Sequence, residues 1–155
     1  MTGSRAEALV ALEMAALAAL LLPWTWLAAR RTPLPRVRAR LRAWLRPRRA
    51  GSRLSALAIG RIVAGVGRRL PGIGTCLTQA LVTEALLHRE HHAARLVIGV
   101  ERPGAKVIRA HAWVESAGGI VIGAAKDLGR FVPIAVGNGT FLKGSDRTFQ
   151  RSGYV

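Results

Sequence analysis

The sequence predicts an α+β fold in which helices come first and an antiparallel sheet follows. Up to Arg89, apolar residues recur at spacings of three and four, which is the period of an amphipathic helix. After the histidine-rich turn His88–His92, the pattern changes to the alternation of strands, with glycine or proline between the runs. The 155 residues suit one domain with a real core, and half of them are apolar, which excludes a disordered chain.

Local signals place four helices before the strands. A proline bars the residue before it from helical geometry, so Thr32–Pro35 ends the first helix. The second and third helices each carry one apolar stripe, formed respectively by Val37, Leu41, Trp44 and Leu45, and by Leu57, Ile59, Ile62, Val63 and Val66. The expected helices are Ala8–Leu27, Arg36–Arg46, Leu54–Leu70 and Cys76–Arg89.

The first helix raises the question of a membrane. Its length is just enough to span a bilayer, and Arg30 and Arg31 behind it fit a cytoplasmic flank. Glu13 near its middle and Pro23 count against a span, and its acidic start is unlike that of a secretory signal. We expect a helix packed on the domain or on a partner, with interfacial attachment and a true span as alternatives.

The charge is concentrated in the first half of the chain. Residues 1–75 hold 14 arginines against two acidic residues, a net charge of +12, whereas residues 76–155 have a net charge of +4. Such an excess suits nucleic acid, because neutralised phosphates release counterions. Base stacking needs aromatic residues, however, and only Trp44 accompanies the ten arginines from Arg30 to Arg53. We therefore expect no nucleic-acid partner and assign the arginines to docking an acidic partner or a membrane face.

The single cysteine excludes a disulfide framework and a multi-cysteine zinc site, and it indicates a reducing compartment. Cys76 follows the turn-forming run Pro71–Thr75 and begins a helix for which Thr75 is the expected N-cap. In the first turn, the helix dipole and the free backbone N–H groups favour the thiolate. Cys76 is therefore a candidate nucleophile, with an inert buried cysteine as the alternative.

Three strands are expected to follow as an antiparallel meander, at Ala94–Glu101, Val107–Ser116 and Ile120–Gly123. In the second strand, Ala112 and Val114 share the apolar face, while His111 shares the other face with Trp113. If the meander packs against the N-terminus of the Cys76 helix, His111 can reach the sulfur and act as its base.

The remaining histidines, His88, His91 and His92, stand with Glu90 at the end of the Cys76 helix. Their spacing also suits a metal, but it is typical of a solvated, cationic helix C-terminus. We therefore expect neither a metal nor any other cofactor.

Four strings in the second half share their pattern with a known family. They are Cys76-Leu77 at a helix start, a strand that ends in Ile98-Gly99-Val100, Ala110-His111-Ala112-Trp113-Val114-Glu115, and Val121 to Asp127 followed by Arg130-Phe131-Val132-Pro133. Together they resemble the transglutaminase-like cysteine peptidases that remove leader peptides in lasso-peptide biosynthesis. The resemblance covers about residues 70–135. It implies a transglutaminase-like or papain-like fold, with an Arg-rich helical region over residues 1–69 and a catalytic region over residues 70–155 in one compact domain.

The same resemblance implies a catalytic triad. Cys76 is the nucleophile, His111 the general base and acid, and Asp127 the carboxylate that orients the imidazole. Asp146 and Glu115 are the alternatives for the carboxylate.

The implied reaction is hydrolysis of the bond between leader and core of a ribosomally made precursor, through a thioester. Trp113 either walls the substrate cleft or fills the core. The implied partners are the precursor's leader peptide, a separate leader-recognition protein and an ATP-dependent lasso cyclase. From the single cysteine we expect a cytoplasmic protein, with membrane association through residues 8–27 as an alternative. Two alternatives stay open: a transglutaminase-like acyltransferase or amidase of another pathway, and a non-enzymatic basic adaptor for membrane or nucleic acid.

Overall fold

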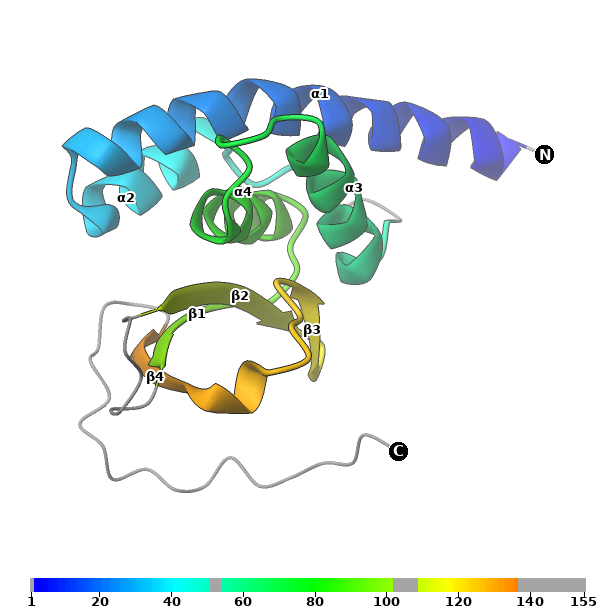
Figure 1. The fold of residues 1–155 in the computed structure, drawn as a ribbon. Coiled ribbons are helices and arrows are strands. Elements are labelled where there is room, and N and C mark those ends of the chain that lie inside the picture. The colour runs from blue at the N-terminus through cyan, green and yellow to red at the C-terminus, as the bar shows by residue number, and fades with distance from the viewer. Residues whose placement is uncertain (1, 51–53, 102–108, 137–155) are drawn as a thin grey trace.

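The computed structural model describes residues 2–50, 54–101 and 109–136, and it shows a layer of helices stacked on an antiparallel sheet (Figure 1). The helices are α1 (Thr2–Arg31), α2 (Leu34–Trp44), α3 (Ala56–Arg68) and α4 (Cys76–Arg89). The strands are β1 (Arg95–Glu101), β2 (Ala110–Ser116), β3 (Gly119–Ile122) and β4 (Phe131–Val136), with a short 3-10 helix, η1 (Leu128–Arg130), before the last. The predicted α+β class is confirmed.

The sheet has the order β3-β2-β1-β4, and every neighbouring pair of strands is antiparallel. Strands β1, β2 and β3 form the predicted meander, although residues 107 and 108 of the expected second strand lie outside the described residues. Strand β4 was not predicted, because Pro133 weakens the strand pattern. Pro133 is tolerated opposite Gly99 because β4 is an edge strand of the sheet.

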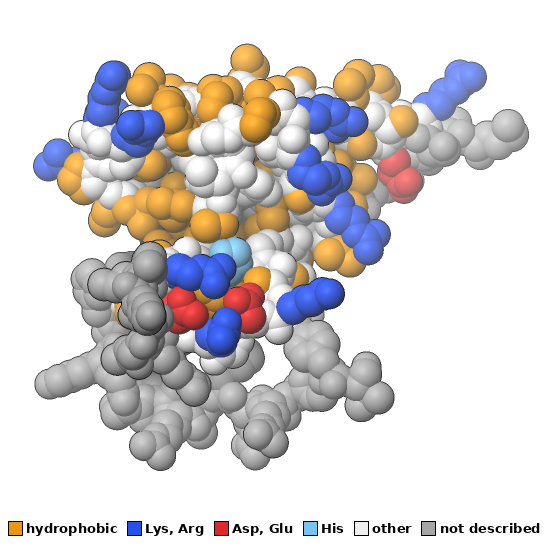
Figure 2. Space-filling view, viewed as in Figure 1, with side chains coloured by type: hydrophobic (Ala, Val, Ile, Leu, Met, Phe, Trp, Pro, Cys, Tyr) orange, Lys and Arg blue, Asp and Glu red, His pale blue; other side chains and the backbone are white. Residues whose placement is uncertain are grey.

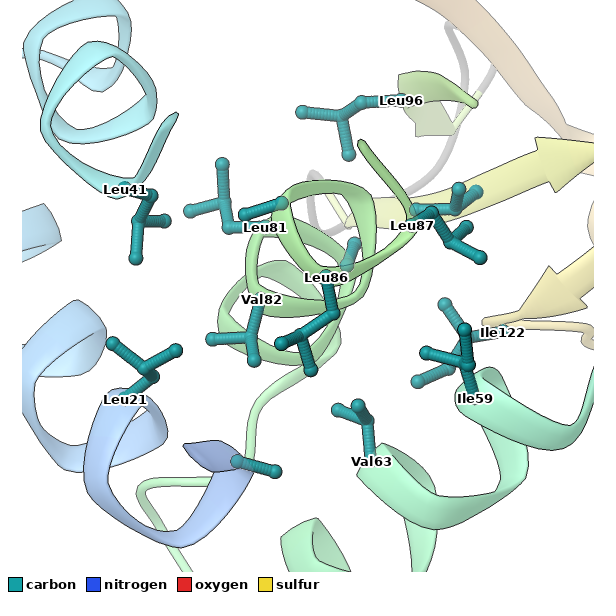
Figure 3. Close-up of a cluster of buried hydrophobic side chains, with 14 of the residues drawn as sticks. Leu21, Leu41, Ile59, Val63, Leu81, Val82, Leu86, Leu87, Leu96 and Ile122 are labelled. Atoms are coloured by element: carbon teal, nitrogen blue, oxygen red, sulfur yellow. The ribbon is translucent and has the colours of Figure 1, made fainter. Parts of the chain in front are cut away.

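Helix α4 lies at the centre of the main core, and its buried side chains meet every other helix and the sheet (Figure 3). Around it lie Leu21 of α1, Leu41 of α2, Ile59 and Val63 of α3, Leu96 of β1 and Ile122 of β3. A helix that is surrounded in this way is apolar on all sides, which explains the dense run of Leu, Val and Ala in its sequence. The packing around α4 therefore fixes the position of the helix, including its first residue, Cys76.

The helix boundaries agree with the prediction for α4 and differ in detail elsewhere. Helix α2 begins before Arg36, because a proline near the first turn fits a helix start. Two side chains expected in apolar stripes are exposed, since Leu57 keeps 44% and Trp44 57% of its surface. Trp44 still packs on the ring of Trp24, with the ring centroids 4.3 Å apart.

Helix α1 is longer than expected and continues through Pro23. It packs on α2, α3 and α4, and Met14, Leu22 and Thr25 on this side are fully buried. Among the described residues, α1 is the helix that is long and apolar enough to cross a membrane by length and composition, over Arg5–Arg31. The prediction that it packs on the domain is confirmed for this inner side.

Ion pairs join the helices and use part of the arginine excess. The buried Glu84 of α4 accepts a hydrogen bond of 2.9 Å from Nε of Arg38, and Arg42 lies 3.3 Å from the same carboxylate. On the other side of α4, the carboxylate of Glu13 pairs with Arg48 and Arg89. These arginines stabilise the fold, which corrects the assignment of the whole arginine-rich stretch to docking.

Candidate active site

The sole cysteine occupies the first position of α4. Thr75 is the N-cap, as predicted, and its Oγ1 accepts a hydrogen bond of 3.3 Å from the N–H of Thr78. The N–H of Gln79 donates to the carbonyl of Thr75, so two first-turn donors are satisfied. The N–H groups of Cys76 and Leu77 have no acceptor within the part of the chain that the structure describes. Cys76 itself is half-buried, beside these two free donors.

The loop in front of Cys76 is locked by close backbone packing. Gly74 lies so near α3 that a Cβ atom there would come within 2.3 Å of the carbonyl oxygen of Gly67. The side-chain amide of Gln79 donates a hydrogen bond of 2.6 Å to the carbonyl of Gly74. Thr78 adds a second tie, because its hydroxyl donates to the carbonyl of Ile73 at 2.7 Å. Sequence reasoning missed these supports, although the paired glycines before a helix start were a visible signal.

His111 lies in β2 and its ring is part-buried. Its Nε2 donates a hydrogen bond of 2.7 Å to the main-chain oxygen of Gly123, just after β3. The ring stacks on Trp113, with centroids 6.2 Å apart, and lies 5.4 Å from the ring centroid of Phe131. The aromatic rings and the carbonyl therefore fix both the place and the orientation of the imidazole.

The sheet presents its two faces to different surroundings. Ala112 and Val114 belong to the main core, which the sheet shares with α4. His111 is on the opposite face, where Trp113 and Phe131 form a second, smaller cluster. The predicted alternation along β2 is thus confirmed, but it is the apolar face that packs on the helices. Within the described residues, no hydrogen bond joins His111 to Cys76, and their shared role stays a prediction.

Asp127 lies between two arginines. Its carboxylate is 3.9 Å from Nη1 of Arg109, just before β2, and 4.0 Å from Nη1 of Arg130 in η1. Figure 2 shows acidic and basic side chains side by side over the sheet, next to a histidine. Arg109 precedes His111 by two residues in the sequence. The described contacts of Asp127 are nevertheless with the arginines, and its role in the triad stays a prediction.

The alternative carboxylates have other surroundings. Glu115 accepts a hydrogen bond of 3.0 Å from the indole N–H of Trp113 and lies 3.8 Å from Arg95. Asp146 lies outside the described residues.

Trp113 is 5% exposed, and its place in the small cluster with Phe131 fits the core alternative given for it.

His91 and His92 bond to main-chain carbonyls of two described residues between α2 and α3. Nε2 of His91 bonds to the carbonyl of Arg48 at 2.6 Å, and Nε2 of His92 bonds to the carbonyl of Leu54 at 2.9 Å. The described contacts of both rings are therefore with the backbone, at Arg48 and Leu54.

Comparison with known proteins supports the family suggested by these elements. The family model described as the transglutaminase-like superfamily matches residues 18–136, which include the central helix and all four described strands. No curated protein and no solved structure shows significant similarity to the chain. Members of this superfamily are typically enzymes, either cysteine proteases or transglutaminases. Since the match covers most of the sequence, the chain belongs to the transglutaminase-like superfamily.

Proposed function

We propose that this protein is a cysteine peptidase that removes the leader peptide from a ribosomally synthesised lasso-peptide precursor. The observation that carries the proposal is the position of Cys76 at the first residue of α4, in a chain of the transglutaminase-like superfamily. A nucleophilic cysteine needs a site that favours its thiolate, and the N-terminus of a helix supplies one. The strings that resemble the leader peptidases surround this same cysteine and His111.

In the proposed reaction, His111 takes the proton of the Cys76 thiol, and the sulfur attacks the carbonyl carbon of the bond between leader and core. The N–H groups of Cys76 and Leu77 donate to the developing oxyanion, because they have no other acceptor among the described residues. The C–N bond then breaks, and the leaving amine takes the proton from His111. Water hydrolyses the thioester with His111 as base, and the thiol is restored.

The reaction requires His111 and Cys76 to meet in the substrate complex. Because His111 lies on the face of β2 that points away from the helices, this meeting requires the start of β2 to turn toward the N-terminus of α4 when the substrate binds. Catalytic hydrogen bonds commonly become short and aligned only in the substrate complex. Asp127 is the carboxylate that we propose as the third member. It acts on the imidazolium through its charge, since the Nε2 proton of His111 is bound to Gly123 in the free protein.

The proposed partners follow from the leader-peptidase role. A separate leader-recognition protein holds the leader and passes it to the peptidase, and an ATP-dependent cyclase closes the ring of the released core. Exposed arginines of α3 that form no ion pair within the described structure, such as Arg61 and Arg68, are the part of the basic surface left to bind an acidic leader or partner.

The proposal is tested by mass spectrometry of the short precursor encoded beside the gene, incubated with this protein and the recognition protein. The wild type should release leader and core as two fragments, and Cys76→Ala should leave the precursor intact. His111→Ala should slow cleavage by roughly 10²- to 10⁴-fold. A matched control is His88→Ala, an exposed histidine on the same helix as Cys76, which should cleave like the wild type.

The outcomes separate the proposal from its alternatives. An amine-linked product in place of two fragments would identify an acyltransferase. Intact precursor with both the wild type and Cys76→Ala would refute the peptidase function.

A further inference from the structure

Helix α1 is apolar on the side that faces away from the protein as well as on the side that faces the core. Its inner side places Met14, Ala18 and Leu22 in the core. On its outer side, large apolar side chains keep much of their surface exposed: Leu9 68%, Leu12 68%, Leu20 73% and Leu27 41%. A helix that is apolar all round belongs in a core or against a membrane. The exposed leucines on the outer side of α1 are therefore expected to be buried against a partner or a membrane.

At about 100° per residue, the outer leucines fall on one side of α1 and form a strip along it. At a rise of about 1.5 Å per residue, the stretch from Leu9 to Leu27 is roughly 27 Å long. Glu13 is the only charged residue within Ala8–Leu27, and its carboxylate is turned to Arg48 and Arg89 of the fold. Figure 2 shows hydrophobic side chains along the outer edge of the helical layer, with basic side chains toward both ends.

The C-terminal end of this strip combines tryptophan with arginine. The guanidinium carbon of Arg30 lies 4.6 Å from the centroid of a Trp26 ring, and Trp24 packs on the exposed Trp44 of α2. Amphipathic tryptophan and arginine side chains are typical of the level of lipid headgroups, where the ring stays apolar on one side and the cation meets phosphate.

The helical layer also presents a cationic surface beside the strip. Three of its acidic side chains, Glu13, Glu84 and Glu90, are engaged with arginines inside the fold. The arginines Arg30, Arg31, Arg36, Arg40 and Arg46 are exposed and form no ion pair within the described part of the chain. A surface with exposed leucines and unpaired cations is complementary to an anionic bilayer.

From this combination we infer that α1 docks the protein on the surface of an anionic membrane, with its outer leucines in the interface and its arginines on lipid phosphates. The helix lies in the plane of the membrane. A transmembrane position would withdraw the fully buried Met14 and Leu22 from the core and break the ion pairs of Glu13. The sheet lies on the side of the molecule away from α1, so His111 and its surroundings stay in water when the protein is bound (Figure 1).

The inference is tested by co-sedimentation of the full chain with vesicles of phosphatidylcholine alone or with added phosphatidylglycerol. We expect binding to the anionic vesicles that weakens as salt is raised. Leu20→Gln should weaken this binding by roughly tenfold or more, because burial of a leucine side chain raises affinity by at least that factor. Leu57→Gln is the matched control, since Leu57 is 44% exposed on α3 and should bind like the wild type.

A second variant separates loss of membrane binding from loss of the fold. Arg30→Gln with Arg31→Gln leaves the core untouched and should weaken binding to anionic vesicles while sparing the thermal unfolding midpoint. Equal binding of Leu20→Gln and Leu57→Gln would overturn the inference. The inference would also be overturned if the protein failed to bind vesicles and instead formed a dimer in analytical ultracentrifugation. Failure to bind vesicles together with binding of the leader-recognition protein to the α1 strip would overturn it as well, because either result assigns the strip to a protein partner.

Discussion

Nε2 of His111 donates a hydrogen bond of 2.7 Å to the main-chain oxygen of Gly123. A carbonyl oxygen can only accept, so in the neutral ring Nε2 carries the proton and Nδ1 holds the free lone pair. The carbonyl is presented by a residue with φ of +81°, a backbone conformation that favours glycine. Gly123 therefore determines which nitrogen of His111 is available to receive a proton from Cys76 in the proposed reaction.

The tautomer of His111 is the first prediction. We expect the ¹⁵N spectrum of the free protein, at a pH where the ring is neutral, to show His111 protonated at Nε2. The signal is assigned by its loss in His111→Gln. A ring protonated mainly at Nδ1 would contradict the hydrogen bond to Gly123, whether or not the protein cleaves a precursor.

The second prediction concerns the carboxylate. Because Asp127 is paired with Arg109 and Arg130 and does not hold the ring, Asp127→Asn should lower the cleavage rate by about tenfold, through the lost stabilisation of the imidazolium. This loss is smaller than that expected for His111→Ala. Single-turnover cleavage of the precursor by the two variants measures both effects. Equal losses would mean that Asp127 takes over the Nε2 proton in the substrate complex.

The third prediction separates backbone strain from steric clash at Gly123. Gly118 and Gly123 have nearly the same φ, +79° and +81°, but only at Gly123 would a Cβ atom meet other residues, at 2.6 Å from the carbonyl oxygen of Ala112. Gly118→Ala should cost about 1 kcal/mol from φ alone. Gly123→Ala should cost about 1–3 kcal/mol more, because β2 and the Trp113 side chain must move.

Urea unfolding of both variants measures the difference. The His111 tautomer in Gly123→Ala shows whether the loss reaches the imidazole. Equal stabilities of the two variants would show that β2 yields to the added methyl group at no cost.

The sequence was most informative where structure is local. Thr75 caps α4 and Cys76 begins it as predicted, because a cap depends on hydrogen bonds to residues only a few positions away. The alternation along β2 was also correct, since it depends only on the pleat of the strand. Strand β4 was missed because its pairing with β1 joins distant segments and its Pro133 is acceptable only at a sheet edge.

The relation between the site residues could not be predicted in this way. Whether His111 faces the N-terminus of α4 depends on which side of the sheet packs on the helices. The small, apolar side with Ala112 and Val114 does so, because its burial stabilises the core. The hydrogen bond from His111 to the carbonyl of Gly123 could not be predicted from residue types, because every residue has a main-chain carbonyl. Only the fold directs this carbonyl toward His111.

The fourth prediction tests the loop in front of the nucleophile. Gly74→Ala places a Cβ atom 2.3 Å from the carbonyl oxygen of Gly67, so the loop must move away from α3 and take the start of α4 with it. We expect slower alkylation of Cys76, together with a lower unfolding midpoint. Gly129→Ala is the control, because a Cβ atom there meets nothing within 4 Å. Unchanged alkylation in Gly74→Ala would show that the loop does not position the thiol.

The last prediction concerns the buried carboxylate of α4. Glu84→Gln keeps the shape of the side chain but removes the buried negative charge that Arg38, which is 13% exposed, and Arg42 contact. Removal of one member of a buried pair costs roughly 3–5 kcal/mol, so the free energy of unfolding in urea should fall by that order. Glu115→Gln is the control, because its partner Arg95 is 46% exposed and such pairs contribute about 1 kcal/mol or less. Similar losses in the two variants would show that the ion pairs of Glu84 contribute no more to stability than an exposed pair does.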